Sequence, residues 1–331
     1  MLTLKENLGL DAFQKVIFEE QDLQIDPAVK ETVQNSFDFL KRFSENKVIY
    51  GVNTGFGPMA QYKIKDSERI QLQFNLIRSH ASGTGNPIPP IYVKAAMLAR
   101  LNTLSLGNSG VHPSVIELMT TLINKDITPV IFEHGGVGAS GDLVQLAHMA
   151  LALIGEGEVI YKGVRSPTQE VFEQEGLKPI TIALREGLAL INGTSVMTGI
   201  GIINSIYARK LLNWMIACSA SINEIVKAYD DHLSLELNQT KKHKGQRKIA
   251  ELMRDHLKDS TLTRKREDHL YRNNPDVAVF EEKVQEYYSI RCVPQILGPV
   301  LDTLNSVEKI LMEEVNSAND NPIVDVAQQQ V

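Results

Sequence analysis

One glycine-rich stretch of the chain has residue types and spacing that could do chemistry. It runs from Gly135 to His148 and reads GGVGASGDLVQLAH, and the apolar run Leu143–Ile154 predicts a helix directly after the glycines. A backbone amide can attack a carbonyl two residues earlier only where side chains do not block the bend, and glycine relieves that block best. Attack of the Gly141 nitrogen on the Ala139 carbonyl, with loss of two waters that include the Ser140 hydroxyl, would leave a methylidene-imidazolone. This ring is a strong electrophile built from the chain itself.

The same stretch has two other interpretations. It satisfies G-x-G-x-x-G after the strand-like run Pro129–Phe132, which is the pattern of a dinucleotide-binding loop. It is also compatible with an ordinary glycine-rich helix start. The α/β-hydrolase elbow G-x-S-x-G does not fit, because Asp142 stands where its last glycine should be. From this stretch alone all three interpretations, including self-cyclisation, remain open.

Composition limits the class of protein. A chain of 331 residues can form one large domain or two, and its 43% hydrophobic content is enough for a sizeable core. A net charge of -6 argues against nucleic acid or an anionic membrane as partner. The two cysteines, Cys218 and Cys292, form no disulfide framework or zinc pattern, and the N-terminus shows no secretory signal. Polar residues dilute the uncharged stretch Gly187–Ala208, which favours a buried helix with a polar turn over a membrane span. We therefore expect a cytoplasmic protein.

Helical periodicity dominates the first two thirds of the chain. Asp26 can cap a helix over about Pro27–Phe43, in which apolar residues recur at helical spacing. The same spacing predicts further helices at Ser67–Ser79, Pro90–Ser105 and Pro113–Asn124. Extended runs are short and few: Lys47–Tyr50, Glu158–Tyr161 and Ile180–Ile182. Such a small β content gives little support to a doubly wound sheet, so the dinucleotide interpretation loses most of its support.

The last third is expected to be nearly all helical from Gly199 onward. Its final helix carries Val300, Leu304, Val307 and Leu311 as a stripe typical of a helical bundle. The change from short, glycine-broken helices to long ones predicts a domain boundary near residue 205. We expect an N-terminal domain at residues 1–205 and a bundle domain at residues 206–331.

Other cofactor chemistries have no signature in the sequence. None of the eight histidines belongs to an H-E-x-x-H pair or to a histidine–carboxylate cluster with ligand spacing. The G-x-x-x-x-G-K-[ST] phosphate loop is also missing from the sequence. We therefore expect no metal and no nucleotide cofactor.

Several separate stretches, in family order, resemble the aromatic amino acid ammonia-lyases, which act on histidine, phenylalanine or tyrosine. The similarity is greatest to bacterial tyrosine ammonia-lyases. It implies a mainly α, aspartase-like helical bundle behind a glycine-rich N-terminal domain with a few short strands. The matching stretches are Tyr50–Gly57, Ser79–Gly83, Gly135–His148, Asn192–Thr194, Tyr288–Gln295 and Asn316–Pro322.

The resemblance implies a reaction that removes ammonia and a β-proton from an aromatic L-amino acid. The methylidene-imidazolone from Ala139-Ser140-Gly141 would make the amine a competent leaving group. Tyr50 matches the family base, and its glycine-rich loop would be a mobile lid. Tyr288 resembles a second active-site tyrosine. We further expect Asp142 to cap the helix behind the ring.

The substrate-binding residues are implied in the same way. Arg291 resembles the arginine that binds the substrate carboxylate, a role suited to a planar two-pronged donor. Asn192 resembles the asparagine beside the ring and the amine, and Asn321 resembles a further polar contact. His80 lies at the selectivity position, where it could hydrogen-bond a tyrosine phenol or a histidine imidazole.

Ser79-His80 resembles the histidine enzymes, but the general similarity to tyrosine ammonia-lyases favours conversion of L-tyrosine to 4-coumarate. Conversion of L-histidine to urocanate, an aminomutase of the same family and an inactive helical scaffold remain alternatives. Family members are substantially longer than 331 residues and form homotetramers with active sites shared between subunits. The resemblance therefore implies a C-terminally truncated chain, which we expect to be inactive or poorly soluble alone.

Overall fold

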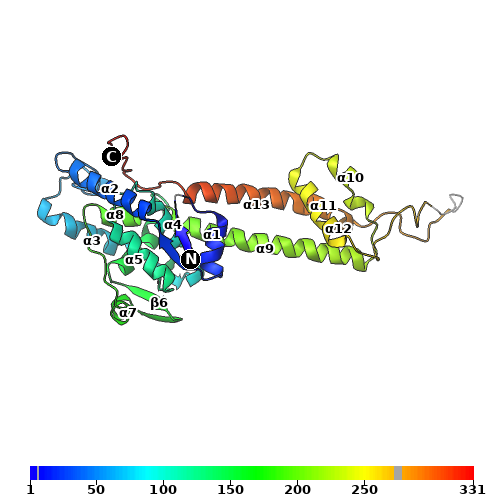
Figure 1. The fold of residues 1–331 in the computed structure, drawn as a ribbon, viewed down its shortest axis with the longest axis horizontal. Helices are drawn as coiled ribbons and strands as arrows, with labels where there is room; N and C mark the ends of the chain where they lie inside the picture. The colour runs from blue at the N-terminus through cyan, green and yellow to red at the C-terminus, as the bar shows by residue number, and fades with distance from the viewer. Residues whose placement is uncertain (6, 272–277) are drawn as a thin grey trace. The chain divides into compact units, whose positions relative to one another are not determined.

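The computed structural model describes residues 1–5, 7–271 and 278–331. These residues form a mainly helical protein with few short strands, which confirms the predicted fold class. They cluster into two compact units (Figure 1). The first unit contains Met1–Asn204 and Ile310–Val331, and the second contains Ser205–Lys309.

The first unit is built around one buried helix, α4 (Pro90–Ser105), which packs against α1, α2 and α5 (Figure 1). Nearly every residue of α4 from Ala95 onward is buried, including the polar side chains of Arg100 and Asn102, so this helix is enclosed around its whole circumference. The other helices of this unit are α1 (Leu10–Phe18), α2 (Pro27–Phe43), α3 (Arg69–His80), α5 (Pro113–Asn124), α6 (Leu143–Leu153), α7 (Thr168–Glu175) and α8 (Glu186–Ile191).

The strands of the first unit are too few and too short for a dinucleotide-binding domain. A parallel pair, β1 (Leu2–Leu4) with β2 (Leu23–Ile25), and an antiparallel pair, β3 (Thr84–Pro87) with β5 (Phe132–His134), stand apart from each other. A three-stranded antiparallel sheet contains β4 (Thr128–Pro129), β6 (Glu158–Tyr161) and β7 (Val164–Pro167). The described residues contain no doubly wound parallel sheet, so the dinucleotide interpretation is wrong.

The uncharged stretch Gly187–Ala208 forms a buried helix, a polar turn and the start of a second helix, as predicted. Helix α8 ends at Ile191, and α9 (Ser195–Ile225) begins after the turn Asn192–Thr194. Within the described residues, no helix is long and apolar enough to cross a membrane.

The second unit is held together by a cluster of apolar side chains. It contains the later part of α9, α10 (Leu235–Gln239), α11 (Lys244–Leu257), α12 (Tyr288–Arg291) and most of α13 (Val293–Val315). The buried members of the cluster are Leu212, Ile216, Leu233, Ile249, Met253, Val293, Leu297 and Leu301. Helices α11 and α13 approach closely where Gly245 faces Gly298, because a Cβ on Gly245 would overlap the Gly298 carbonyl oxygen.

Four expectations about elements are wrong. Residues Lys47–Tyr50 form no strand. Residues Ile180–Ile182 form no strand; Ile180 is buried and donates its N–H to the Leu153 carbonyl instead, and β6 pairs with β7. The described residues between α11 and α12 contain no helix. The predicted stripe of α13 is displaced, since Val300 and Val307 are exposed while its buried side chains in the second unit are Val293, Leu297 and Leu301.

The second compact unit is shorter than the domain expected at residues 206–331. Residues Ile310–Val331 cluster with the first unit. The reason is a set of hydrogen bonds near the end of α13. The Asn316 amide accepts from the Leu8 N–H at 2.8 Å and donates to the Leu8 carbonyl at 2.9 Å, while Asn102 donates to the Val315 carbonyl at 2.8 Å.

Candidate active site

The backbone at Ala139-Ser140-Gly141 is sharply bent. Gly138 and Gly141 have φ values of 74° and 78°, a region that favours glycine. Backbone bridges link Gly138 to Gly141 and Ala139 to Gly141, so the chain doubles back on itself. The Ser140 residue is exposed at the tip of this turn. The chain is therefore sharply folded at the tripeptide for which the resemblance implies ring closure.

The bent turn is held against the turn that follows α8. A backbone bridge joins Gly141 to Gly193, and a Cβ on Gly141 would overlap the Gly193 carbonyl oxygen. The Asp142 N–H donates to that oxygen at 2.7 Å. Only glycine fits at position 141, because both the positive φ and the close approach exclude a side chain.

Asp142 caps a different helix from the one expected. Its carboxylate makes no capping bond to α6. Instead Oδ2 accepts from the backbone N–H groups of Val196 and Met197, each at 2.9 Å, in the first turn of α9. Burial raises the pKa of Asp142, and these two hydrogen bonds oppose that shift. The residue after Ala139-Ser140-Gly141 thus joins α6 to the start of α9.

Asn192 and Asn321 lie together in the structure. Asn192 is buried at the end of α8, and its Nδ2 donates to the Asn321 carbonyl at 3.4 Å. Asn321 is exposed, and its own N–H donates to Asp320 Oδ1 at 2.9 Å. Since Gly193 follows Asn192 directly, Asn192 lies on the turn that contacts Gly141, and Asn321 is linked to that turn by this hydrogen bond.

Arg100 is a residue of this region that the sequence analysis did not single out. It is fully buried on α4 and donates to the carbonyls of Ala189 and Asn192 and to Asn319 Oδ1. The available signal was a charged residue inside the apolar run Met97–Leu104. That pattern marks a buried charge but does not reveal its partners.

Tyr50 lies on a loop that is tied to α3 and α8. Its hydroxyl accepts from the Gly57 N–H at 3.3 Å, within its own loop. The neighbouring Gly51 carbonyl accepts from Gln73 Nε2 at 3.0 Å, and Gln73 Oε1 accepts from the Leu188 N–H at 3.1 Å. One glutamine side chain therefore anchors the Tyr50 loop to the helix that ends at Asn192.

His80 is the last residue of α3, and its orientation is set by its own helix. Nδ1 lies 2.9 Å from the Leu76 carbonyl, and a carbonyl only accepts, so Nδ1 carries the proton. In the neutral ring Nε2 is then an acceptor. The following loop is fixed by α6, because the Gly83 N–H donates to His148 Nε2 at 3.0 Å.

Tyr288 and Arg291 belong to the second unit. The Tyr288 side chain is 73% exposed, and the Arg291 guanidinium lies 4.6 Å from the centre of its ring. Arg291 Nε donates to the Glu286 carbonyl at 3.0 Å. Among the described residues, no carboxylate lies within ion-pair distance of Arg291, so a guanidinium edge is available to a ligand.

The residues present fit a self-formed ring. The tripeptide is bent, its third residue tolerates no side chain, and its hydroxyl-bearing residue is exposed. In the described part of the chain, no group of three or more His, Cys, Asp or Glu side chains is placed to hold a metal ion.

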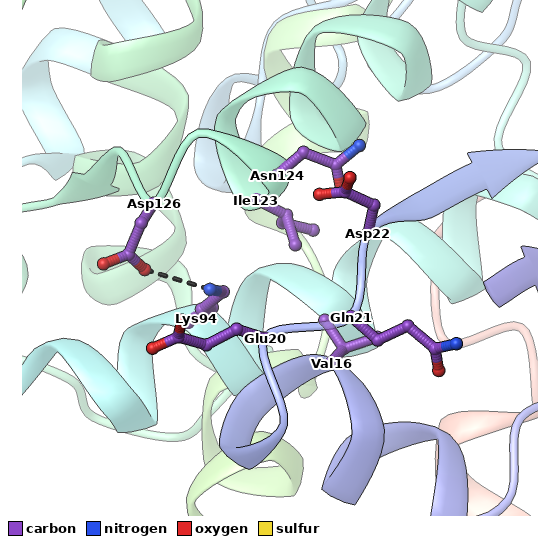
Figure 2. Close-up of a pocket in the computed structure, with 8 residues that line it drawn as sticks. All are labelled: Val16, Glu20, Gln21, Asp22, Lys94, Ile123, Asn124 and Asp126. Atoms are coloured by element: carbon purple, nitrogen blue, oxygen red, sulfur yellow. Dashed lines mark hydrogen bonds and ion pairs between the residues drawn. The ribbon is translucent and has the colours of Figure 1, made fainter. Parts of the chain in front are cut away.

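A separate pocket of about 200 Å³ lies elsewhere on the first unit (Figure 2). Figure 2 shows the ion pair between Lys94 Nζ and Asp126, 3.0 Å long, at one side of this pocket. Asn124, also in its wall, exchanges two hydrogen bonds of 2.8 Å with the Leu23 backbone. None of the predicted site residues lines the pocket, and its polar contacts tie α4 and β2 to the end of α5.

Known proteins resemble this chain in both sequence and fold. The family model for aromatic amino acid lyases matches residues 8–331. Tyrosine 2,3-aminomutase from Myxococcus sp. (strain Mx-B0) is 44% identical over 286 residues, which cover 85% of this chain and 54% of that protein. Histidine ammonia-lyase from Geobacillus sp. (strain WCH70) is 39% identical over 322 residues, which cover 96% of this chain and 60% of that protein. The chain therefore spans between half and two thirds of the length of these relatives.

Solved structures of related enzymes have the same fold as this chain. Phenylalanine aminomutase from Pantoea agglomerans superposes with a TM-score of 0.93 at 31% identity, over 100% of this chain and 65% of that one. Tyrosine aminomutase from Streptomyces globisporus also has a TM-score of 0.93, at 34% identity, over 98% of this chain and 63% of that one. With its bent Ala-Ser-Gly turn and its match over residues 8–331, the chain belongs to the aromatic amino acid lyase family.

Proposed function

We propose that this chain is part of an enzyme that eliminates ammonia from an aromatic L-amino acid. Its substrate is L-tyrosine and its product is 4-coumarate. One observation carries the proposal: in a member of the aromatic amino acid lyase family, Ala139-Ser140-Gly141 is bent back on itself and clamped against Gly193. The methylidene-imidazolone that this tripeptide would form supplies an electrophile, which converts the amine into a competent leaving group.

The remaining chemistry is assigned to side chains of the chain. Tyr50 accepts the β-proton at its phenol oxygen, and the anchored loop that carries it orients that oxygen. Arg291 binds the substrate carboxylate through its available guanidinium edge. Asn192 and Asn321 provide polar contacts beside the ring, and Tyr288 supplies a second phenol. These roles are proposals that rest on the family resemblance at each position.

The hydrogen-bonding state of His80 favours tyrosine over phenylalanine as substrate. Because Nδ1 donates to the Leu76 carbonyl, Nε2 of the neutral ring accepts. A tyrosine phenol is a donor that can satisfy this nitrogen, whereas a phenylalanine ring offers none. A site built to hydrogen-bond a substrate hydroxyl rejects the analogue that lacks it.

Two other activities are supported by the relatives. Histidine ammonia-lyases match 96% of this chain, and a histidine imidazole can also donate to His80 Nε2. Tyrosine aminomutases match in both sequence and structure, and they would use the same electrophile and the same aromatic substrate. The product distinguishes the three activities: a tyrosine ammonia-lyase gives 4-coumarate, a histidine ammonia-lyase gives urocanate and a tyrosine aminomutase gives β-tyrosine.

The test combines peptide mass with product analysis of the purified full-length protein. We expect the peptide containing Ala139–Gly141 to be lighter by two waters, and incubation with L-tyrosine to release 4-coumarate. Ser140→Ala should abolish both signals, because it removes the hydroxyl that leaves as the second water. Ser67→Ala, which changes an exposed serine elsewhere in the first unit, is the matched control. A full-mass peptide from folded wild-type protein would overturn the proposal.

We further propose a homotetramer, located in the cytoplasm. Helix α9 in the second unit exposes large apolar side chains, among them Leu211 (62% exposed), Trp214 (70%) and Ile225 (74%), and an assembly would cover such side chains. Both cysteines are free thiols, as expected in a reducing compartment. Sedimentation velocity of the protein tests the proposed tetramer, and a stable monomer would contradict it.

A further inference from the structure

Arg100 joins three segments of the first unit that are far apart in sequence. It lies on α4, and its side chain is fully buried. Nη2 donates to the carbonyls of Ala189 and Asn192, the latter at 3.0 Å, and Nη1 donates to Asn319 Oδ1 at 3.2 Å. One guanidinium therefore holds the end of α8 and the loop after α13.

The charge of Arg100 is not neutralised by direct pairing. Among the described residues no carboxylate lies within ion-pair distance of it, whereas the other fully buried arginine, Arg185, pairs with Asp320 at 2.8 Å. Burial lowers the pKa of the Arg100 guanidinium. A buried charge that meets only neutral acceptors is costly to keep, so its position demands a reason beyond packing.

The Arg100 side chain lies directly behind Gly193. A Cβ on Gly193 would overlap Arg100 Nη1, so the two groups are in contact. On its other side Gly193 meets Gly141, and its carbonyl accepts from the Asp142 N–H at 2.7 Å. Gly193 is thus a thin backbone layer between the guanidinium and the ring-forming tripeptide.

Asn319 holds the residue on the far side of Gly193. Its Oδ1 accepts from Arg100, and its Nδ2 donates to Thr194 Oγ1 at 2.8 Å and to Glu314 at 3.3 Å. Thr194 in turn donates to Glu314. Since Arg100 fixes the carbonyl of Asn192, both neighbours of Gly193 are held, and the glycine between them cannot retreat from Gly141.

We propose that Arg100 is a positioning residue for formation of the prosthetic group, because it fixes the turn Asn192–Thr194 as the surface against which Gly141 is bent. This inference rests on the function proposed above. In the step concerned, a bond forms between the Gly141 nitrogen and the Ala139 carbonyl carbon, and the carbonyl oxygen leaves as water. The Ser140 hydroxyl leaves with the Ser140 α-hydrogen as the second water. No oxidant or other reactant is needed.

The experiment compares matched variants of the two buried arginines, Arg100→Lys and Arg185→Lys. For each purified protein, the fraction of the Ala139–Gly141 peptide that has lost two waters is followed by mass spectrometry from the time of expression. Folding is checked by circular dichroism and by hydrogen exchange of α4. We expect Arg100→Lys to close the ring at least tenfold more slowly than wild type while folded. Arg185→Lys should lower thermal stability but still reach complete ring closure.

The outcomes separate the inference from the function beneath it. A full-mass wild-type peptide would remove the proposed function and this inference together. A wild-type protein with a closed ring, beside a folded Arg100→Lys protein that closes it equally fast, overturns the inference alone. If Arg100→Lys does not fold, the Asn319→Ala variant tests the inference instead. It removes the contacts to Arg100 and Thr194 from a partly exposed side chain, and it should slow closure severalfold; closure at the wild-type rate contradicts the inference.

Discussion

Single side chains in this protein serve backbone groups that are distant in sequence. The Asp142 carboxylate caps α9 rather than the helix that it precedes, and His148 accepts from the N–H of Gly83. Both residues lie within the glycine-rich stretch Gly135–His148. That stretch is thus connected by side-chain hydrogen bonds to the start of α9 and to the loop that follows His80.

At the scale of a residue, His148 should make the protein less stable in acid. Burial lowers its pKa from 6.5, so the neutral ring, which accepts from Gly83, is favoured in the fold. Its contribution to stability is fully present above pH 6.5 and is lost as pH falls through the lower folded-state pKa. We expect the free energy of unfolding to decrease from pH 8 to pH 5 by more in wild type than in His148→Gln, whose amide oxygen can accept the same N–H. Urea denaturation at both pH values measures the difference.

Two further variants make this prediction specific. His148→Leu removes the acceptor and should cost about 1 kcal/mol at pH 8, because a partly buried N–H loses its partner. His243→Gln changes an exposed histidine that makes no capping bond to α11, and it controls for loss of a histidine in general. Equal pH dependence in wild type and His148→Gln would contradict the assignment.

The types of the site residues could be predicted from sequence, but their partners could not. Gly141 was identified because only glycine permits the bend, and the structure adds that it also faces Gly193. Asp142 was assigned to the wrong helix, since the N–H groups of Val196 and Met197 reach it only through the tertiary fold. Arg100 was missed because nothing local distinguishes a buried arginine with carbonyl partners from one with a carboxylate.

At the scale of elements, strong local signals predicted well. The helices at Pro27–Phe43, Pro90–Ser105 and Pro113–Asn124 were predicted with their observed bounds, because proline stands in the first turn of each and apolar periodicity continues to the end. The apolar run Ile180–Ile182 failed because burial alone does not create a strand; its one assigned backbone bond goes to the end of α6.

The contact between α11 and α13 depends on two glycines and can be tested directly. A Cβ on Gly245 would overlap the Gly298 carbonyl oxygen, and one on Gly298 would meet the Gln246 backbone nitrogen at 2.5 Å. Alanine improves helix propensity by about 1 kcal/mol, but the steric cost of separating the helices is about 1–3 kcal/mol and should prevail. We expect Gly245→Ala to reduce the hydrogen-exchange protection of α11.

The control for this change lies next to it. Lys244→Ala replaces an exposed residue on the same helix and should leave the protection of α11 unchanged. Protection of α11 in Gly245→Ala equal to that in wild type would mean that the helices do not meet at these glycines.

At the scale of the whole molecule, the buried carboxyl of Glu186 should make stability depend on pH near neutrality. It accepts from the N–H groups of His112 at 2.7 Å and Ala183 at 2.6 Å, yet burial raises its pKa from 4.5 to about 7. The contribution of the neutral group is fully present below pH 4.5 and is lost as pH rises through about 7. Relative to Glu186→Gln, wild type should lose about 2 kcal/mol of unfolding free energy between pH 5 and pH 8.

This difference is measured by denaturation at the two pH values. Glu170→Gln, at an exposed position in the first turn of α7, is the control for loss of a carboxylate. A constant difference in stability between wild type and Glu186→Gln would show that Glu186 stays ionised in the fold.

The predicted site is divided between the two compact units. Tyr50, His80, the Ala139–Gly141 turn and Asn192 belong to the first, whereas Tyr288 and Arg291 belong to the second. The resemblance implies that the residues of one site come from more than one subunit. Each of these residues could be named from a local stretch of sequence, but no local pattern encodes how residues of different elements or subunits come together.

Because the bent turn is held against Gly193 only in the folded protein, ring closure would mark each molecule that has folded. Under the proposed chemistry, the ring closes only where folding has forced Gly141 toward Ala139. The new bonds are covalent and therefore survive denaturation. The mass of one peptide then records whether a given chain has ever reached its native state, so that even a fully unfolded sample can be sorted into molecules that once folded and molecules that never did.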